Sequence, residues 1–177
     1  MQTKKRQRSA MYTTEILRGY IKSLDRTLEP IESEEDFFRM YDRLILDKSH
    51  FAQLRWQLLA AWKRAQKGEV QELYRLQIKE TDTLYENREL HAALAHYIGA
   101  DPTFPWIDLP VLCWRDDGDA CVVLWTAPSA RRLGLATDIV NRLKISRVYD
   151  PPSSSVTFWN RLRIDGVDKL PGSGQLL

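Results

Sequence analysis

The stretch that decides the fold is residues 120–143, which read ACVVLWTAPSARRLGLATDIVNRL. Its first part, residues 120–125, is a short Val-rich apolar run, which is typical of a buried strand. Pro128 and a short loop follow this run. Over residues 133–143 the apolar positions recur at helical spacing, at Ile139, Val140 and Leu143. The stretch therefore predicts a buried strand that enters an amphipathic helix through a tight loop.

The start of this helix is a candidate site for an anion. The first N–H groups of a helix have no intrahelical acceptor, and the helix dipole places positive charge there. Gly134 has no Cβ, so a ligand can approach the backbone closely. Arg131 and Arg132 add positive charge beside it. Together these features predict that the loop and the helix bind a diphosphate.

The flanking segments extend the prediction to a small sheet. Apolar runs at 111–114 and 120–125 flank the turn dipeptide Asp117-Gly118, which predicts a β-hairpin. Three prolines make residues 101–110 an extended connector. After the helix we expect a strand at 145–149, a second helix at about 155–162 and a short strand at about 164–170.

The first hundred residues read as helical. Apolar periodicity predicts helices over 12–28, after Ser33, after Ser49 and over 69–98, the last interrupted near Thr83. The expected fold class is therefore α+β, with a largely helical N-terminal part followed by a β-hairpin–α–β–α core. The expected organisation is a disordered basic tail at 1–10, a helical region at 11–100 and the core at 101–177.

The order of these signals resembles the GNAT superfamily of N-acetyltransferases. In that family a strand ends in an apolar-x-apolar-x-Pro pattern, followed after two residues by Arg or Gln and then by x-x-Gly-x-Gly/Ala. This chain carries matching residues at Leu124, Pro128, Arg131, Gly134 and Ala136. The family's second landmark, an aromatic pair followed by a leucine, is matched in the right order by Phe158, Trp159 and Leu162. The resemblance covers about residues 111–170.

The resemblance implies that acetyl-CoA is the cofactor. The strand backbone would pair with the pantetheine amides at Leu124, Trp125 and Thr126. The loop and helix start would hold the pyrophosphate at Arg131, Arg132, Leu133, Gly134, Leu135, Ala136 and Thr137. The thioester would lie between this strand and the strand at 145–149, and an amine of a protein or small molecule would attack it directly.

The chain also departs from the family pattern. Thr126 stands where the family prefers an apolar residue. Trp159 stands where the family often places a tyrosine that protonates the departing thiolate, and we assign this catalytic role to Tyr149, with serines 153–155 as alternatives. No acidic residue lies within 121–125, where a general base often sits, and the family's first strand is not visible among residues 11–100.

These departures keep a second hypothesis open. The chain is then a non-catalytic GNAT-like binding or structural module, which uses its helical region for contacts with protein or nucleic acid. The segment 55–67 combines basic and aromatic residues, so it forms either a core face through Trp62 or an exposed basic-aromatic face. Helices at this density often pack on a second subunit, and we expect a homo-oligomer.

Composition bounds the partners and the compartment. The formal net charge of +2 over 177 residues is too small to indicate nucleic-acid binding by itself. The basic run Lys4–Arg8 reads as a solvated tail, with a nuclear-localisation or nucleic-acid arm as the alternative. No run approaches the length of a membrane span, so we expect no membrane association.

The cysteines and histidines exclude two further classes. Cys113 and Cys121 fall in apolar runs, where reduced, buried thiols are the ordinary state, so we expect a cytoplasmic protein. The histidines lie at 50, 91 and 96, and none shares a helix face at ligand spacing with another. We therefore predict no metal site.

Overall fold

A mixed β-sheet forms the centre of the molecule. The computed structural model describes residues 12–46, 51–67, 71–79, 82–116 and 118–167. Within them six strands lie in the order β1-β2-β3-β4-β5-β6. The pairs β1–β2, β2–β3 and β3–β4 are antiparallel, whereas the pairs β4–β5 and β5–β6 are parallel. Their bounds are β1 Arg26–Pro30, β2 Gln71–Ile78, β3 Ile107–Asp116, β4 Ala120–Thr126, β5 Arg147–Tyr149 and β6 Asp165–Val167.

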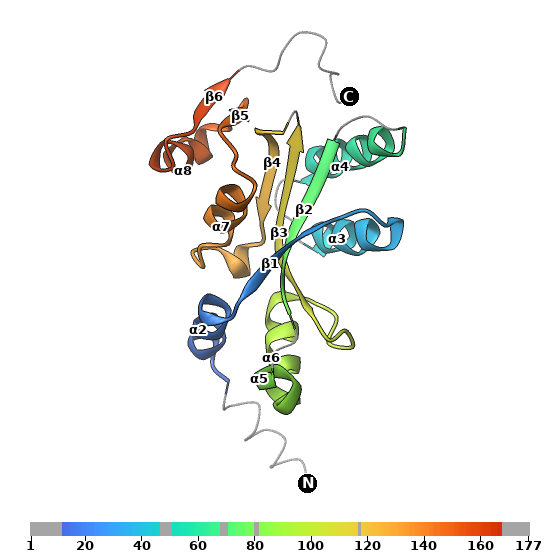
Figure 1. Ribbon diagram of the computed structural model, residues 1–177, viewed down its shortest axis with the longest axis vertical. Helices are drawn as coiled ribbons and strands as arrows, with labels where there is room; N and C mark the ends of the chain where they lie inside the picture. Colours follow the sequence, from blue (N-terminus) through green and yellow to red (C-terminus); the bar gives the residue numbers. More distant parts are fainter. Residues whose placement is uncertain (1–11, 47–50, 68–70, 80–81, 117, 168–177) are drawn as a thin grey trace.

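Helices cover the two faces of this sheet. The helices α7 and α8 lie on one side of it and α3 and α4 on the other, while α5 and α6 lie near one end of β2 and β3 (Figure 1). The described α-helices are α2 Thr14–Ser23, α3 Glu34–Leu46, α4 Phe51–Gln66, α5 Asp82–Glu86, α6 Arg88–Ile98, α7 Leu135–Arg142 and α8 Val156–Arg161. Short 3-10 turns, η1 Pro128–Ala130 and η2 Ser153–Ser155, precede α7 and α8.

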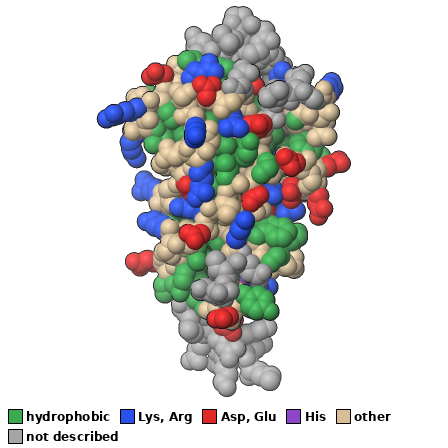
Figure 2. All heavy atoms as spheres, viewed as in Figure 1, with side chains coloured by type: hydrophobic (Ala, Val, Ile, Leu, Met, Phe, Trp, Pro, Cys, Tyr) green, Lys and Arg blue, Asp and Glu red, His purple; other side chains and the backbone are tan. Residues whose placement is uncertain are grey.

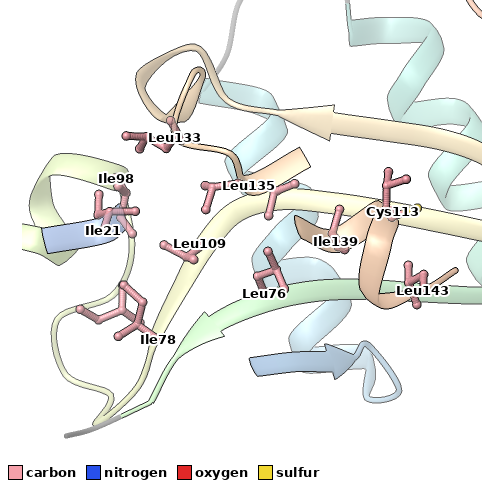
Figure 3. Packing of buried hydrophobic residues seen from close by; sticks show 14 of the residues in the cluster. Ile21, Leu76, Ile78, Ile98, Leu109, Cys113, Leu133, Leu135, Ile139 and Leu143 are labelled. Carbon is pink, nitrogen blue, oxygen red and sulfur yellow. The ribbon is translucent and has the colours of Figure 1, made fainter. Parts of the chain in front are cut away.

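The larger core lies under α2, α6, α7 and α8. Alternate residues of β3 point into it, because successive side chains of a strand face opposite sides of a sheet. Figure 3 shows Leu135 and Ile139 of α7 lying over Leu76 of β2 and Leu109 of β3. The strand contributes Ile107, Leu109, Val111 and Cys113.

The opposite face of the sheet packs on α3 and α4. The intervening residues of β3, Leu112 and Trp114, belong to this second core. The rings of Phe37 and Trp62 stack there, with centroids 4.7 Å apart. Trp62 is 7% exposed, so the interpretation of this residue as a core residue is confirmed.

The prediction of helix throughout residues 11–100 is wrong at two segments. The predicted helix 12–28 ends at Ser23, and Arg26–Pro30 forms β1. The predicted helix 69–98 begins instead as strand β2, which pairs with β1 on one side and β3 on the other. Leu73 and Leu76 have helical spacing in sequence, but they face the two different cores. A strand buried on both faces does not display a clean two-residue period.

The predicted connector 101–110 is also shorter than expected. Strand β3 begins at Ile107 and includes Pro110. The register between β2 and β3 shifts beside this proline, so the strand bulges there. Pro110 has no N–H to donate to the ladder, but its carbonyl accepts a hydrogen bond from the Ala127 N–H at 2.9 Å.

The remaining element predictions are confirmed. The hairpin joins β3 to β4, and Gly118 adopts φ +83° in its turn, although Asp117 lies outside the described residues. The helix predicted at 133–143, the strand at 145–149, the helix at 155–162 and the short strand at 164–170 correspond to α7, β5, α8 and β6. The basic tail predicted at 1–10 lies outside the described residues.

Candidate functional site

The open edge of strand β4 is the first part of the candidate site. The parallel pairing of β4 with β5 covers only Ala120 with Arg147 and Cys121 with Val148. Directly after this pairing, Val122 is an extra residue on β4, because Trp114 faces Val123 while Arg115 faces Cys121. Such a bulge bends a strand and ends regular pairing. The two strands therefore separate along the second half of β4.

The backbone groups on this edge follow from the register. The Ala127 N–H donates to β3, so the residues at 123, 125 and 127 direct their backbone groups toward β3. The alternate residues Leu124 and Thr126 direct theirs toward the open edge. The Thr126 carbonyl accepts from the Arg131 Nε at 3.3 Å. The edge at Leu124 is thus available to an extended ligand that offers its own amide groups.

The loop between β4 and α7 concentrates backbone N–H groups. Arg132 has φ 63° and Gly134 has φ 74°, both in the left-handed region, and α7 begins at Leu135. The N–H groups of residues 132–137 donate to no group of the described chain. The next N–H group along the chain, that of Asp138, donates to the Gly134 carbonyl. Consecutive unpaired N–H groups in such a turn form an anion-binding concavity. The geometry fits the diphosphate site that the sequence predicts.

Two residues that the sequence analysis missed hold this loop from behind. The Arg18 guanidinium, on α2, donates to the carbonyls of Ser129 at 2.9 Å and Arg131 at 2.7 Å. The Tyr97 hydroxyl, on α6, donates to the same Ser129 carbonyl at 2.9 Å. The Ser129 and Arg131 carbonyls of the loop therefore face α2 and α6. No local motif announces these contacts, because Arg18 is 113 residues away from Arg131 in the chain.

The apolar residues of the loop anchor it in the larger core. Ala130, Leu133 and Leu135 are each no more than 3% exposed. Figure 3 shows Leu133 near Ile98 and Ile21, beside the start of α7. Of the predicted cofactor residues, Leu133 and Leu135 therefore offer their N–H groups but not their side chains. Arg131 and Arg132 are exposed, and Ala136 and Thr137 are half-buried.

The charge at the start of α7 is mixed, whereas the surface along the neighbouring edge of the molecule is basic. Asp138 lies in the first turn of α7, where it forms ion pairs with Arg26 at 3.2 Å and Arg142 at 2.8 Å. Both pairs reduce its negative charge near the loop. Figure 2 shows Lys and Arg side chains along the edge of the molecule where α7 and α8 lie in Figure 1. These positive charges would attract an anion to this edge over a long range.

Tyr149, the predicted catalytic residue, ends strand β5. Its side chain is 6% exposed, and its hydroxyl makes no hydrogen bond to the described residues. Val148 faces the larger core, so Tyr149 projects from the opposite face of the sheet. Trp159, which the resemblance aligns with the tyrosine of the GNAT pattern, is 4% exposed and packs in the larger core. Trp159 therefore serves the packing of α8.

Asp119, the acidic residue nearest to β4, has a structural role. Its carboxylate accepts hydrogen bonds from Arg147 at 2.7 Å and from the Ser146 hydroxyl at 2.6 Å. These two bonds hold the pKa of Asp119 below its ordinary value. They fix the start of β5 beside β4, so Asp119 sets the position at which the two strands begin to separate.

Across the described ranges, no three residues of the types His, Cys, Asp and Glu gather as ligands of a metal ion would. The same ranges hold no helix with the length and apolarity that crossing a bilayer requires. No family model matches the chain, and neither the curated proteins nor the solved structures include a match to it.

Proposed function

We propose that this chain is a GNAT-like N-acetyltransferase, which binds acetyl-CoA along β4 and at the start of α7 and passes the acetyl group to an amine. The observation that carries the proposal is the run of unpaired N–H groups at residues 132–137 directly after a strand whose far edge is open. A diphosphate would accept from these N–H groups, and an amide-bearing arm would pair with β4.

The strands found among residues 11–100 support the proposal. The absence of a visible first strand was a departure from the family pattern, and β1 and β2 supply strands ahead of the hairpin. The separation of β4 from β5 also agrees with the gap in which the family places the pantetheine arm. The chemistry then needs no covalent enzyme intermediate, because the amine attacks the thioester carbonyl directly.

The residues assigned to this chemistry act by position and proton transfer. Backbone groups of Leu124 and Thr126 would orient the arm, and the loop from Arg131 to Thr137 would hold the diphosphate. Tyr149 lies at the end of β5, on the other side of the gap, and is the proposed proton donor to the departing thiolate. The acceptor is an amine of a protein or a small molecule.

Binding of coenzyme A by isothermal titration tests the cofactor part. We expect Gly134→Arg to abolish the binding heat, because a Cβ at Gly134 meets nothing within 4 Å and a long side chain there would cover the N–H groups. Gly118→Arg is the matched control, since Gly118 also has a positive φ and open space but lies in the distant hairpin turn. Absence of heat with the unmodified protein at millimolar coenzyme A contradicts the proposal.

Release of coenzyme A from acetyl-CoA in the presence of amines tests the enzymatic part. We expect Tyr149→Phe to lower the rate constant of transfer by about a hundredfold, within the usual contribution of a general acid, while leaving cofactor binding unchanged. Binding without any amine-dependent release favours the second candidate.

The second candidate is a non-catalytic module of the same fold that contacts a protein or nucleic acid. Trp56, on α4, is 71% exposed, which is unusual for a tryptophan away from an interface. Trp56→Ser then abolishes association with the partner without changing the free energy of unfolding by more than about 0.5 kcal/mol. A Trp56 variant with unchanged behaviour in every pull-down and sedimentation experiment contradicts this candidate.

A further inference from the structure

A cavity lies at the end of β4, beside the loop that leads to α7. Its volume is about 390 Å³, and it opens between α3, the end of α6 and the end of β4. This volume is within the range of small-molecule sites. The residues that give it its chemical character are Arg43, Tyr97, Pro110, Trp125 and Pro128.

Arg43 is a cation of this cavity, and no carboxylate of the described residues bonds to it. Its guanidinium donates to the Asp108 backbone carbonyl at 2.9 Å, to the Ile98 carbonyl and, weakly, to the Met40 sulfur at 3.9 Å. A guanidinium has five N–H donors in a planar fork. Within the described chain its Nε and the second N–H of Nη2 donate to nothing.

The neighbouring carboxylates are already engaged. The Asp108 carboxylate accepts hydrogen bonds from Gln77 at 2.6 Å and from Arg39 at 3.2 Å. The Asp36 carboxylate accepts hydrogen bonds from Arg39 at 2.7 Å and from a second arginine, Arg75, at 3.0 Å.

The cluster that these side chains form has an excess of positive charge. The cluster contains three guanidiniums, those of Arg39, Arg43 and Arg75, and two carboxylates, those of Asp36 and Asp108. Burial lowers the pKa of Arg43 to about 10, since the nearby charge of Asp108 only partly offsets it. Arg43 therefore remains charged at neutral pH, in surroundings that strengthen its attraction for an anion.

Trp125 supplies an aromatic wall of the cavity. Its ring lines the cavity although the residue is only 4% exposed, and its indole nitrogen is buried. The cavity thus combines a cation with aromatic and apolar walls.

We infer that this cavity binds a small molecule that carries one carboxylate on an aromatic or apolar body. The carboxylate would bond the free N–H groups of Arg43, a planar pairing that guanidinium and carboxylate favour. The body of the ligand would lie among Tyr97, Pro110 and Trp125. The inference does not require the proposed cofactor, because the carboxylate would bind Arg43 on α3 whereas the diphosphate would bind the N–H groups of residues 132–137, although the cavity reaches Ser129 of the same loop.

A series of three probes on the unmodified protein provides the test. Phenylacetate, its neutral isostere phenylacetamide and the cation phenethylamine are titrated at pH 8, above the ordinary titration range of histidine side chains. Two-dimensional ¹H–¹⁵N spectra follow the indole N–H of Trp125, assigned through Trp125→Phe. We expect phenylacetate to shift this signal and to bind about tenfold more tightly than phenylacetamide, with no binding of phenethylamine.

Variants then locate the carboxylate. Arg43→Met should abolish phenylacetate binding and Arg43→Lys should weaken it about tenfold, because lysine keeps the charge but loses the fork. Arg142→Met, which removes a surface arginine of α7, and Gly134→Arg should leave phenylacetate binding unchanged. The latter variant separates this inference from the cofactor proposal.

Several outcomes overturn the inference. Equal binding of phenylacetate and phenylacetamide shows that charge does not matter, and absence of binding by phenylacetate up to about 50 mM shows that the cavity is not a carboxylate site. A folded Arg43→Met variant that retains phenylacetate binding has the same consequence. If Arg43→Met does not fold, the comparison of the three probes on the unmodified protein decides.

Discussion

Arg18 and Arg131 are joined by a hydrogen bond of 2.7 Å from the Arg18 guanidinium to the Arg131 backbone carbonyl. The bond links α2, near the beginning of the described chain, to the loop that precedes α7. A second bond from Arg18 reaches the Ser129 carbonyl of the same loop at 2.9 Å. Since the carbonyls of the loop are held on this side, its N–H groups remain without internal partners. Helix α2 therefore orients the candidate diphosphate site.

Replacement of Arg18 tests this role. We expect Arg18→Met to weaken coenzyme A binding about tenfold, because the loop loses two charge-assisted bonds that order it before the ligand arrives. Hydrogen exchange at Ala130 and Arg131, whose N–H groups are bonded within the loop, should accelerate in the same variant, whether or not a ligand binds. Lys22→Met is the matched control, as Lys22 is an exposed cation on the same helix. Unchanged exchange in Arg18→Met would contradict the orienting role.

The conformation of Gly134 leads to a prediction about stability. Its φ of 74° is strained for any residue with a Cβ, although the space around it is open. Gly134→Ala should therefore lower the free energy of unfolding by about 1 kcal/mol, the left-handed penalty less the entropic gain. Gly19→Ala, in the helical interior of α2 with equally open space, should raise it by about 0.5–1 kcal/mol. Urea unfolding measures both, and a stabilised Gly134→Ala variant would refute the assigned conformation.

Local signals made the second half of the fold predictable from sequence. Gly118 and Gly134 occupy positions with positive φ, which few residues other than glycine adopt, so each marks a turn. Between and after them the apolar periodicity changes from strand to helix within a few residues. The strand–loop–helix unit, and the candidate N–H groups within it, depend on neighbours in sequence only.

The first half depended on partners that are distant in sequence. Arg75 and Gln77 of β2 are 5% and 7% exposed. Their burial is possible because they donate hydrogen bonds to Asp36 and Asp108. Without that knowledge two polar residues beside Leu73 and Leu76 look like the solvent face of a helix. The alternation of Tyr74, Leu76 and Ile78 was the available signal for a strand. The contacts of Arg18 and the cavity beside Arg43 had no comparable signal.

Asp36 carries a prediction about pH. Burial acts to raise its pKa, but the hydrogen bond and charge of Arg75 and the charge of Arg39 prevail and lower it. A carboxyl with a lowered folded-state pKa stabilises the protein above its unfolded pKa of about 3.9, and this contribution is lost as pH falls toward the folded value.

The comparison is between the unmodified protein and Asp36→Asn in urea. At pH 7 the variant should unfold with a free energy lower by about 1–3 kcal/mol, as expected for hydrogen bonds to charged groups. The difference should shrink as pH falls below about 4. Asp42→Asn, at an exposed position of α3, should show neither effect. A difference that grows on acidification would contradict the lowered pKa.

The two cysteines lead to a prediction about reactivity. The sulfur atoms of Cys113 and Cys121 lie 3.8 Å apart in the larger core, and each residue is at most 1% exposed. The hydrogen bond with Cys113, together with burial, raises the pKa of Cys121. Since the thiolate is the reactive species, the native protein at pH 8 should react with an aromatic disulfide reagent at least about a hundredfold more slowly than the unfolded protein.

Two variants separate pKa from access in this reaction. Cys113→Ala removes the neighbouring sulfur but leaves Cys121, on β4, buried in the larger core, so the remaining thiol should stay slow. Lys22→Cys places a thiol at an exposed position of α2, and only that thiol should react rapidly in the native state. Rapid labelling of Cys121 in the native protein would mean that the β3–β4 hairpin opens readily. The site on β4 would then lack the rigid strand that positioning of a cofactor requires.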